Sequence, residues 1–243
     1  MGQDLSIDYA ADGVLDIVFR RPAEGNVLTH AMGDEIAAAL AALRPDAKAV
    51  VVTAEGADFC AGRQSPMPPA GAKPTASDLR RMISDPVLDF YTALRSVPVP
   101  VIAAVHGRSL GVGCALVGLA DLAVASEDAT FAVPEMSRDI APTLVMTALA
   151  DRLPRAALAR LVLSRDTIGA DEAREIGLVG MVVPAAGLDA AVKRVREGLA
   201  ANTVPVLQAV KRFLSLAPEM SYAARRDYAA FANATATSDR FRA

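Results

Sequence analysis

Two short, strongly apolar segments most constrain the fold of this chain. Residues 47–53 (AKAVVVT) and 99–105 (VPVIAAV) are short, rich in valine and continuously apolar, so both are predicted to be strands buried on two faces. A helical pattern precedes the first of them, because apolar residues recur at helical spacing at Met32, Ile36, Leu40 and Leu43. Alternation of such strands with helices is typical of an α/β layer fold.

The segments around these strands extend the same pattern. Leu5–Tyr9 and Val14–Phe19 alternate around Asp12-Gly13 and are predicted to form a hairpin. Residues 65–76 are rich in Pro, Ala and Gly without periodicity, which indicates a mobile surface loop that gates a site. A helical pattern over residues 79–94 is interrupted at Pro86.

The chain from Pro142 onward is mostly helical in character, and Pro205 is placed where a helix begins. Amphipathic, alanine-rich stretches predict helices at residues 154–163, 170–176, 188–200 and 206–216. Such a region is expected to form a separate helical layer or a surface for self-association.

A glycine-containing turn follows each of the two buried strands. The first spans Asp58–Gln64 and the second Gly107–Gly113, which opens the next helix. Glycines at a helix entrance expose backbone N–H groups and the positive end of the helix dipole. If the two strand ends are neighbours, one N–H from each turn can converge on a single oxygen and form an oxyanion hole.

The second turn also matches two other motifs. Residues 107–111 (GRSLG) fit the G-x-S-x-G nucleophile elbow, but an α/β-hydrolase needs a histidine after the serine, and His30 and His106 both precede Ser109. A serine hydrolase is therefore disfavoured, and His106 is expected to be structural. Residues 111–113 lack the third glycine of a dinucleotide fingerprint at its required position.

Composition excludes several classes of function. A net charge of −3 and scattered basic residues provide no field for nucleic acid, and no apolar stretch approaches the roughly 20 residues that span a bilayer. The first ten residues lack a secretory pattern, so a soluble, cytoplasmic protein without membrane partners is expected. Cys60 and Cys114 form no CxxC pair, and two histidines cannot complete a zinc cage, so no metal site is predicted and both thiols are expected to be inert.

Four runs of the sequence match a known set of motifs in the same order. They are residues 26–29 (NVLT), 57–64 (ADFCAGRQ), 106–136 (HGRSLGVGCALVGLADLAVASEDATFAVPEM) and 170–184 (ADEAREIGLVGMVVP). Over nearly the whole chain the sequence thus resembles the crotonase, or enoyl-CoA hydratase/isomerase, superfamily. The resemblance implies an α/β fold with a crotonase-like ββα spiral core and a C-terminal helical region. It also implies an acyl-CoA thioester substrate.

Carried over by residue, the resemblance implies that the N–H groups of Arg63 and Val112 form the oxyanion hole and that Glu135 is the acid/base. Val112 stands where the family usually has glycine, and Ala115 stands at the position of the first hydratase glutamate. Hydration most directly uses paired carboxylates, whereas moving a double bond needs mainly one base. Double-bond isomerisation is therefore favoured over hydration.

The same resemblance implies the substrate-binding residues. Coenzyme A and the acyl group are expected along Val27, Leu28, Ala61, Gly62, Arg63, Gln64, Gly111 and Val112. Gln64 replaces the family's usual aspartate. The Arg63 guanidinium is either a charge partner for a phosphate or substrate carboxylate, or simply solvated.

Asp139 is a candidate second carboxylate, because four residues after Glu135 it would share one face of a helix. The alternatives are a solvated pair for Asp139 and Glu135, and for Glu135 alone an ordinary surface carboxylate.

These inferences combine into one expectation. Residues 1–185 form the crotonase-like core with the acyl-CoA site, and residues 186–243 form a helical region for oligomerisation and active-site cover. We expect an enzyme with no cofactor beyond coenzyme A as part of its substrate, assembled as a homotrimer or hexamer. A non-catalytic acyl-CoA binder, or another crotonase-type reaction such as hydration, decarboxylation or hydrolysis, is the alternative.

Overall fold

A six-stranded sheet forms the centre of the molecule in a computed structural model that describes residues 4–66, 68–69 and 71–241. The strand order is β1-β2-β3-β4-β6-β9. The strands are β1 (Leu5–Tyr9), β2 (Val14–Phe19), β3 (Ala49–Ala54), β4 (Val101–Val105), β6 (Leu122–Ser126) and β9 (Met181–Val183).

The predicted hairpin and buried strands are confirmed. β1 and β2 pair antiparallel around the Asp12-Gly13 turn, and β2, β3, β4, β6 and β9 follow one another in parallel. Val51 of β3 lies opposite Ile102 of β4, so the two strands that precede the glycine turns are direct neighbours. Their carboxyl ends therefore lie at the same edge of the sheet, as an oxyanion hole built from both turns requires.

A second, three-stranded sheet lies beside this edge. It consists of β5 (Arg108–Leu110), β7 (Thr130–Ala132) and β8 (Ile168–Gly169), with β5 and β7 parallel. The sequence predicted only a turn at residues 107–113, and this was wrong for residues 108–110. Three residues carry too little alternation to indicate a strand, so their pairing with β7 decides it.

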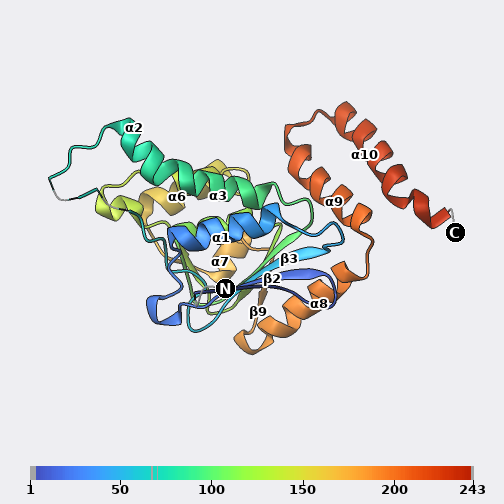
Figure 1. Cartoon of the computed structure of the whole chain (residues 1–243), viewed down its shortest axis with the longest axis horizontal. Helices are drawn as coiled ribbons and strands as arrows, with labels where there is room; N and C mark the ends of the chain where they lie inside the picture. Colours follow the sequence, from blue (N-terminus) through green and yellow to red (C-terminus); the bar gives the residue numbers. More distant parts are fainter. Residues whose placement is uncertain (1–3, 67, 70, 242–243) are drawn as a thin grey trace.

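Helices cover both faces of the large sheet (Figure 1). On one side lie α1 (His30–Ala41) and α3 (Asp85–Arg95), and on the other lies α8 (Leu188–Ala200). Val192, Val195 and Leu199 of α8 pack on Val14 and Val51 of the sheet, so this helix is attached to the core. The remaining helices of the body are α2 (Ala76–Leu79), α4 (Val112–Leu119), α5 (Thr143–Leu149), α6 (Arg155–Ser164) and α7 (Ala170–Glu175).

The interruption predicted at Pro86 takes the form of a π-helical turn. This turn, Arg80–Ser84, connects α2 to α3, and Pro86 is the second residue of α3. Proline has no backbone N–H, but in the first turn of a helix that N–H would have no partner in the helix anyway. The wider π-helical turn before Pro86 lets the helix continue past the proline. Met67 and Ala70, within the predicted gating loop, lie outside the described residues.

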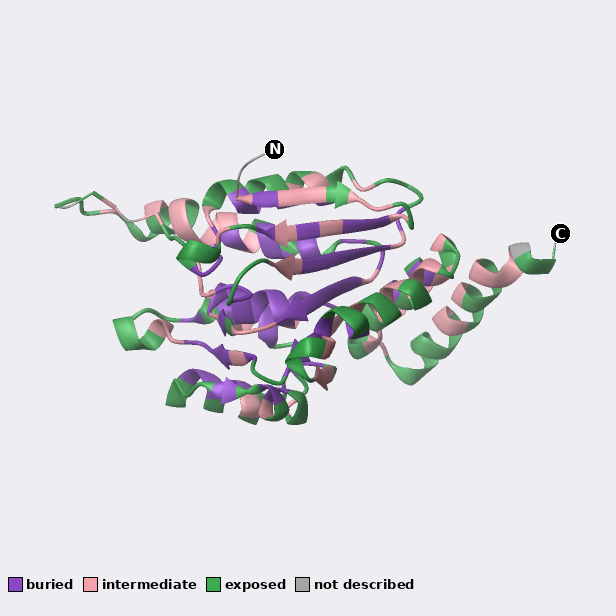
Figure 2. Cartoon of the chain, turned by 90° about the horizontal axis from the view of Figure 1, so that it is seen from below, coloured by how far each residue is buried: buried purple, intermediate pink, exposed green. Residues whose placement is uncertain are grey.

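Two further helices, α9 (Val204–Leu216) and α10 (Tyr222–Thr237), extend away from the body (Figures 1 and 2). Pro205 lies in the first turn of α9, as predicted for a proline at a helix start, whereas α10 was not predicted as a separate helix. Large apolar side chains are exposed on both: Val210, Leu214, Tyr222 and Phe231. Across the described residues, no helix is both long and apolar enough to cross a membrane.

Candidate functional site

A largely apolar cavity of about 490 Å³ lies at the carboxyl edge of the large sheet. Its floor comes from the turn after β3 and the entrance of α4, and its walls come from the α2–α3 segment and from residues 134–145. The lining includes Ala61, Gly62, Arg63, Leu79, Ile83, Val87, Tyr91, Gly111, Val112, Pro134, Glu135, Arg138, Ile140, Leu144 and Val145.

Backbone hydrogen bonds bring the two glycine turns together. The Cys60 N–H donates to the Arg108 carbonyl at 3.0 Å, and the Leu110 N–H donates to the Cys60 carbonyl at 2.9 Å. A Cβ atom at Gly113 would overlap the same Cys60 carbonyl. The entrance of α4 therefore packs directly on the first turn, and this contact requires glycine at position 113.

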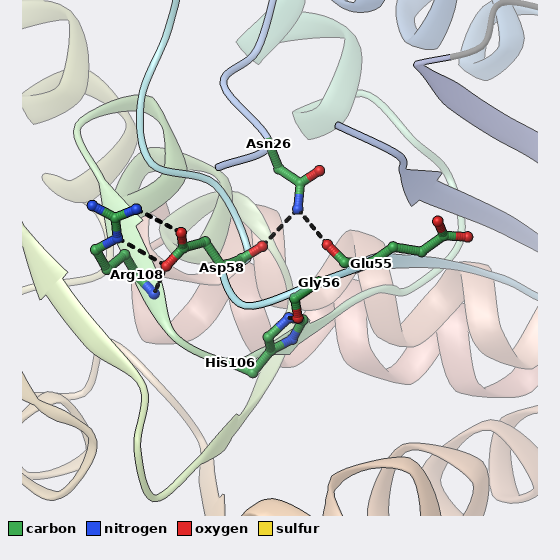
Figure 3. A network of polar contacts seen from close by, with 6 residues as sticks. All are labelled: Asn26, Glu55, Gly56, Asp58, His106 and Arg108. Atoms are coloured by element: carbon green, nitrogen blue, oxygen red, sulfur yellow. Dashed lines mark hydrogen bonds and ion pairs between the residues drawn. The ribbon is translucent and has the colours of Figure 1, made fainter. Parts of the chain in front are cut away.

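Asn26 fixes the start of the first turn (Figure 3). Its buried side-chain amide donates to the carbonyls of Glu55 at 2.8 Å and Asp58 at 2.7 Å, and its Oδ1 accepts from the Arg21 N–H at 2.8 Å. Asn26 has φ 54°, a left-handed conformation that asparagine tolerates better than most residues. Asn26, the first residue of the run 26–29, therefore supports the first glycine turn.

The side chains of Asp58 and Arg108 join the two turns a second time (Figure 3). Asp58 accepts from the Arg108 backbone N–H at 3.0 Å, from Nε at 2.9 Å and from Nη2 at 2.7 Å. The pKa of Asp58 is held below its usual range, chiefly by the hydrogen bonds from the Arg108 side chain. No local sequence pattern indicates this pair, because the two residues are separated by fifty positions and only the neighbouring strands bring them together.

The backbone N–H groups of Arg63 and Val112 both belong to residues that line the cavity. Leu28 pairs with the first turn by donating to the Gly62 carbonyl and accepting from the Gln64 N–H, both at 2.9 Å, which leaves the intervening Arg63 N–H on the opposite side. Val112 is the first residue of α4, so its N–H has no acceptor within the helix. Among the described residues neither N–H has a hydrogen-bond partner.

Valine at position 112 fits the helix entrance because the unusual backbone conformation falls one residue earlier. Gly111 has φ 53° and ψ −109°, which only glycine adopts readily, whereas Val112 is already helical. The β-branched side chain is therefore compatible with the turn.

Glu135 begins a 3-10 helix, Glu135–Arg138, and its carboxyl group turns into the cavity. Oε2 is buried without a hydrogen-bond partner among the described residues, and Oε1 lies where a Cβ at Gly111 would be. Burial raises the pKa of Glu135, and the nearby Arg138 only partly opposes this effect. A carboxyl group with a raised pKa beside unpaired N–H groups can both take up and return a proton.

Four other polar side chains line the cavity, those of Arg63, Ser65, Tyr91 and Arg138. Arg63 was predicted as a site residue and Arg138 was considered only as a partner for a nearby carboxylate, whereas Tyr91 was not predicted to belong to the site. Tyr91 is 3% exposed, and burial raises the pKa of its phenol well above the usual range. An apolar helical pattern includes Tyr91, but no sequence signal indicates that its hydroxyl belongs to a site.

Several predicted site residues lie outside the cavity lining. The helix predicted to align Asp139 with Glu135 is only a 3-10 turn, and Asp139 is exposed with φ 56° beyond its end. The prediction that Asp139 and Glu135 share one face of a helix is therefore wrong, and Asp139 does not line the cavity. Val27 and Gln64 are also outside it, and Leu28 supports the first turn and lines a small adjoining pocket.

The other candidates behave as structural residues. Ser109 is fully buried in β5, which agrees with the rejection of a nucleophile elbow. His106 donates from Nε2 to the Gly56 carbonyl at 3.1 Å and lies outside the cavity lining (Figure 3). Burial raises the pKa of Cys60 to about 11 and that of Cys114 to about 12, as expected for inert thiols.

The strand order, the paired glycine turns and the carboxyl-lined cavity together define a crotonase fold. A solved enoyl-CoA hydratase from Mycobacterium smegmatis matches it with a TM-score of 0.89 at 28% identity, covering 98% of this chain and 92% of that one. A putative enoyl-CoA hydratase from Thermobifida fusca, solved in complex with CoA, has a TM-score of 0.87 at 26% identity, covering 99% and 95%.

The chain belongs to the enoyl-CoA hydratase/isomerase family, whose model matches residues 10–240. It is 30% identical to the 2,3-dehydroadipyl-CoA hydratase of Escherichia coli over 93% of this chain and 89% of that protein. It is 29% identical to the human mitochondrial enoyl-CoA hydratase domain-containing protein 3 over 81% of this chain. That match spans 64% of the human protein.

Proposed function

We propose that this protein acts on acyl-CoA thioesters by forming an enolate, with Glu135 as the proton-transferring group. The thioester oxygen accepts hydrogen bonds from the N–H groups of Arg63 and Val112. The observation that carries the proposal is the Glu135 carboxyl, whose Oε2 is buried without a hydrogen-bond partner among the described residues, in a cavity that both Arg63 and Val112 line. A group in this setting removes a proton next to a carbonyl while the negative charge collects on an oxygen held by backbone donors.

The reaction that best fits one carboxylate is movement of a double bond. Glu135 takes a proton from the α-carbon of a 3-enoyl thioester, and the electron pair delocalises onto the thioester oxygen. The same carboxyl group then returns the proton to the γ-carbon, which gives the 2-enoyl thioester. Ala115, at the place of the first hydratase glutamate, is 0% exposed within α4 and contributes no carboxylate. Among the described lining residues, Glu135 is the only carboxylate.

Proton exchange on a simple saturated thioester tests the proposal, because removal of an α-proton needs no double bond in the ligand. Hexanoyl-CoA is incubated with the protein in D₂O, and deuterium at the α-carbon is measured by mass spectrometry. We expect exchange by the natural protein and at least about a hundredfold loss in Glu135→Gln. Full exchange by the folded Glu135→Gln variant would rule out the proposed role. A parallel incubation with 3-enoyl and 2-enoyl thioesters distinguishes isomerisation from hydration.

A non-catalytic acyl-CoA binder is the second candidate, and the buried Ala115 favours it. Tight binding by calorimetry without exchange or turnover on any acyl-CoA would establish this alternative. In both cases coenzyme A is part of the ligand, and we propose no other cofactor.

We also propose that the chain forms a homo-oligomer, trimeric or hexameric, through part of residues 186–243. α8 belongs to the core, so α9 and α10 are the elements available for this contact. Leu214 is 57% exposed and Phe231 is 75% exposed, and large exposed apolar side chains on projecting helices favour burial against another copy. Light scattering coupled to size-exclusion chromatography tests the assembly, and a monomer at micromolar concentration would contradict it.

A further inference from the structure

The charge balance of the cavity is unusual for a site that would hold a purely hydrocarbon acyl chain. Its charged residues, among those described, are Arg63, Arg138 and Glu135. Arginine stays charged in proteins, so two positive charges face a single carboxylate even when Glu135 is ionised. The cavity therefore presents a net positive charge to its ligand within an otherwise apolar lining.

Arg63 is the more informative of the two arginines. Arg63 is half-buried, and this burial lowers the pKa of its guanidinium. Nη1 donates to the Ile83 carbonyl at 3.3 Å, on the π-helical turn that forms one wall of the cavity. The side chain is therefore anchored against the wall of the acyl cavity.

Within the described part of the chain, no carboxylate lies within 4.0 Å of the Arg63 guanidinium. Two other half-buried arginines are paired with carboxylates: Arg21 with Asp4 at 2.7 Å, and Arg196 with Asp12 at 2.5 Å. The half-buried Arg152 instead donates to the Ala120 carbonyl and does not line the acyl cavity. A partly desolvated guanidinium without a carboxylate has unused donors in a fork that matches a carboxylate in two-point contact.

We propose that the cavity selects acyl-CoA thioesters whose acyl group carries a second carboxylate, and that the Arg63 guanidinium binds this carboxylate. This inference rests on the proposed acyl-CoA function and specifies its substrate class, a thioester of a dicarboxylic acid. Arg63 then acts through two groups, because its N–H contacts the thioester oxygen while its side chain contacts the far end of a short acyl group. Arg138, exposed at the cavity edge, adds attraction for the same charge.

Matched ligands separate this proposal from simple acyl-CoA binding. Calorimetry compares glutaryl-CoA with pentanoyl-CoA and adipyl-CoA with hexanoyl-CoA, so each pair has the same number of acyl carbons and differs in the terminal carboxylate. We expect at least one dicarboxylic member to bind about tenfold more tightly than its partner, the effect of one charge-assisted contact. That ratio should fall to near one in Arg63→Gln and should be intermediate in Arg63→Lys, which keeps the charge and loses the fork.

Arg155→Gln is the matched control, since Arg155 is exposed at the start of α6 and lies outside the cavity lining. Equal or tighter binding of both monocarboxylic thioesters would overturn the proposal while leaving the acyl-CoA function intact. If Arg63→Gln weakens free coenzyme A as much as adipyl-CoA, the guanidinium binds nucleotide phosphates and the proposal is also overturned. If no thioester binds to the folded natural protein, the proposed function itself fails.

Discussion

Replacing Gly111 by alanine tests the central geometry of the site. Two features oppose a side chain at this position: its φ of 53° with ψ of −109°, and the Glu135 Oε1 atom that a Cβ would overlap. The backbone strain should lower the free energy of unfolding by about 1–3 kcal/mol. For a chain of this size that corresponds to a melting temperature lowered by roughly 2–12 °C.

The effect on catalysis should exceed the effect on stability, because the new methyl group must displace the Glu135 carboxyl. A displacement of about 1 Å at a reacting group costs on the order of a hundredfold in rate. We therefore expect Gly111→Ala to exchange the α-protons of hexanoyl-CoA about a hundredfold more slowly than the natural protein. Mass spectrometry in D₂O measures the rate, and a thermal melt measures the stability.

Gly177→Ala provides the matched control for strain alone. Gly177 also has a positive φ, 87°, but a Cβ there would meet only the Arg152 carbonyl, at 3.9 Å. Gly177 lies outside the cavity lining. This variant should lose stability and keep its exchange rate. If folded Gly111→Ala exchanges as fast as Gly177→Ala, the contact between Gly111 and Glu135 does not position the acid/base, and the reasoning is refuted.

Three further predictions concern charge and burial. Asp58→Asn should lower the free energy of unfolding at pH 7 by about 1–3 kcal/mol, since it weakens the bonds from Arg108. Because the pKa of Asp58 is lowered in the fold, this difference should shrink as the pH falls below about 4 in urea denaturation, and a constant difference would argue against the ion pair. Glu135→Gln should melt at a higher temperature than the natural protein at pH 8 and at the same temperature near pH 4. The raised pKa of Glu135 means that the fold loses stability as this buried group ionises with rising pH, so an equal melting temperature at pH 8 would contradict its burial. Cys60 and Cys114 should react slowly with a disulfide reagent at pH 8 and rapidly in urea, because both thiols are buried with raised pKa values; fast labelling of the folded protein would show that the site opens.

Local patterns in the sequence predicted much of the architecture. The hairpin around Asp12-Gly13 and the strand at residues 47–53 follow from alternation and from continuous apolar runs, which report burial directly. The two glycine turns were predicted from their positions after the buried strands and Glu135 from the family resemblance, and the structure brings all three to one cavity. The proton-transfer and oxyanion roles remain predictions for the exchange experiment.

The sequence alone therefore determined the hairpin, the buried strands and several of the helices, and where the glycine turns fall, because these depend on the spacing of neighbouring residues. The tertiary structure decided which residues that are distant in the sequence come into contact. It paired β5 with β7, joined Asp58 to Arg108, left Asp139 outside the cavity and anchored the Arg63 guanidinium on the Ile83 carbonyl. These contacts depend on strand order and on the packing of distant segments, which no local pattern encodes.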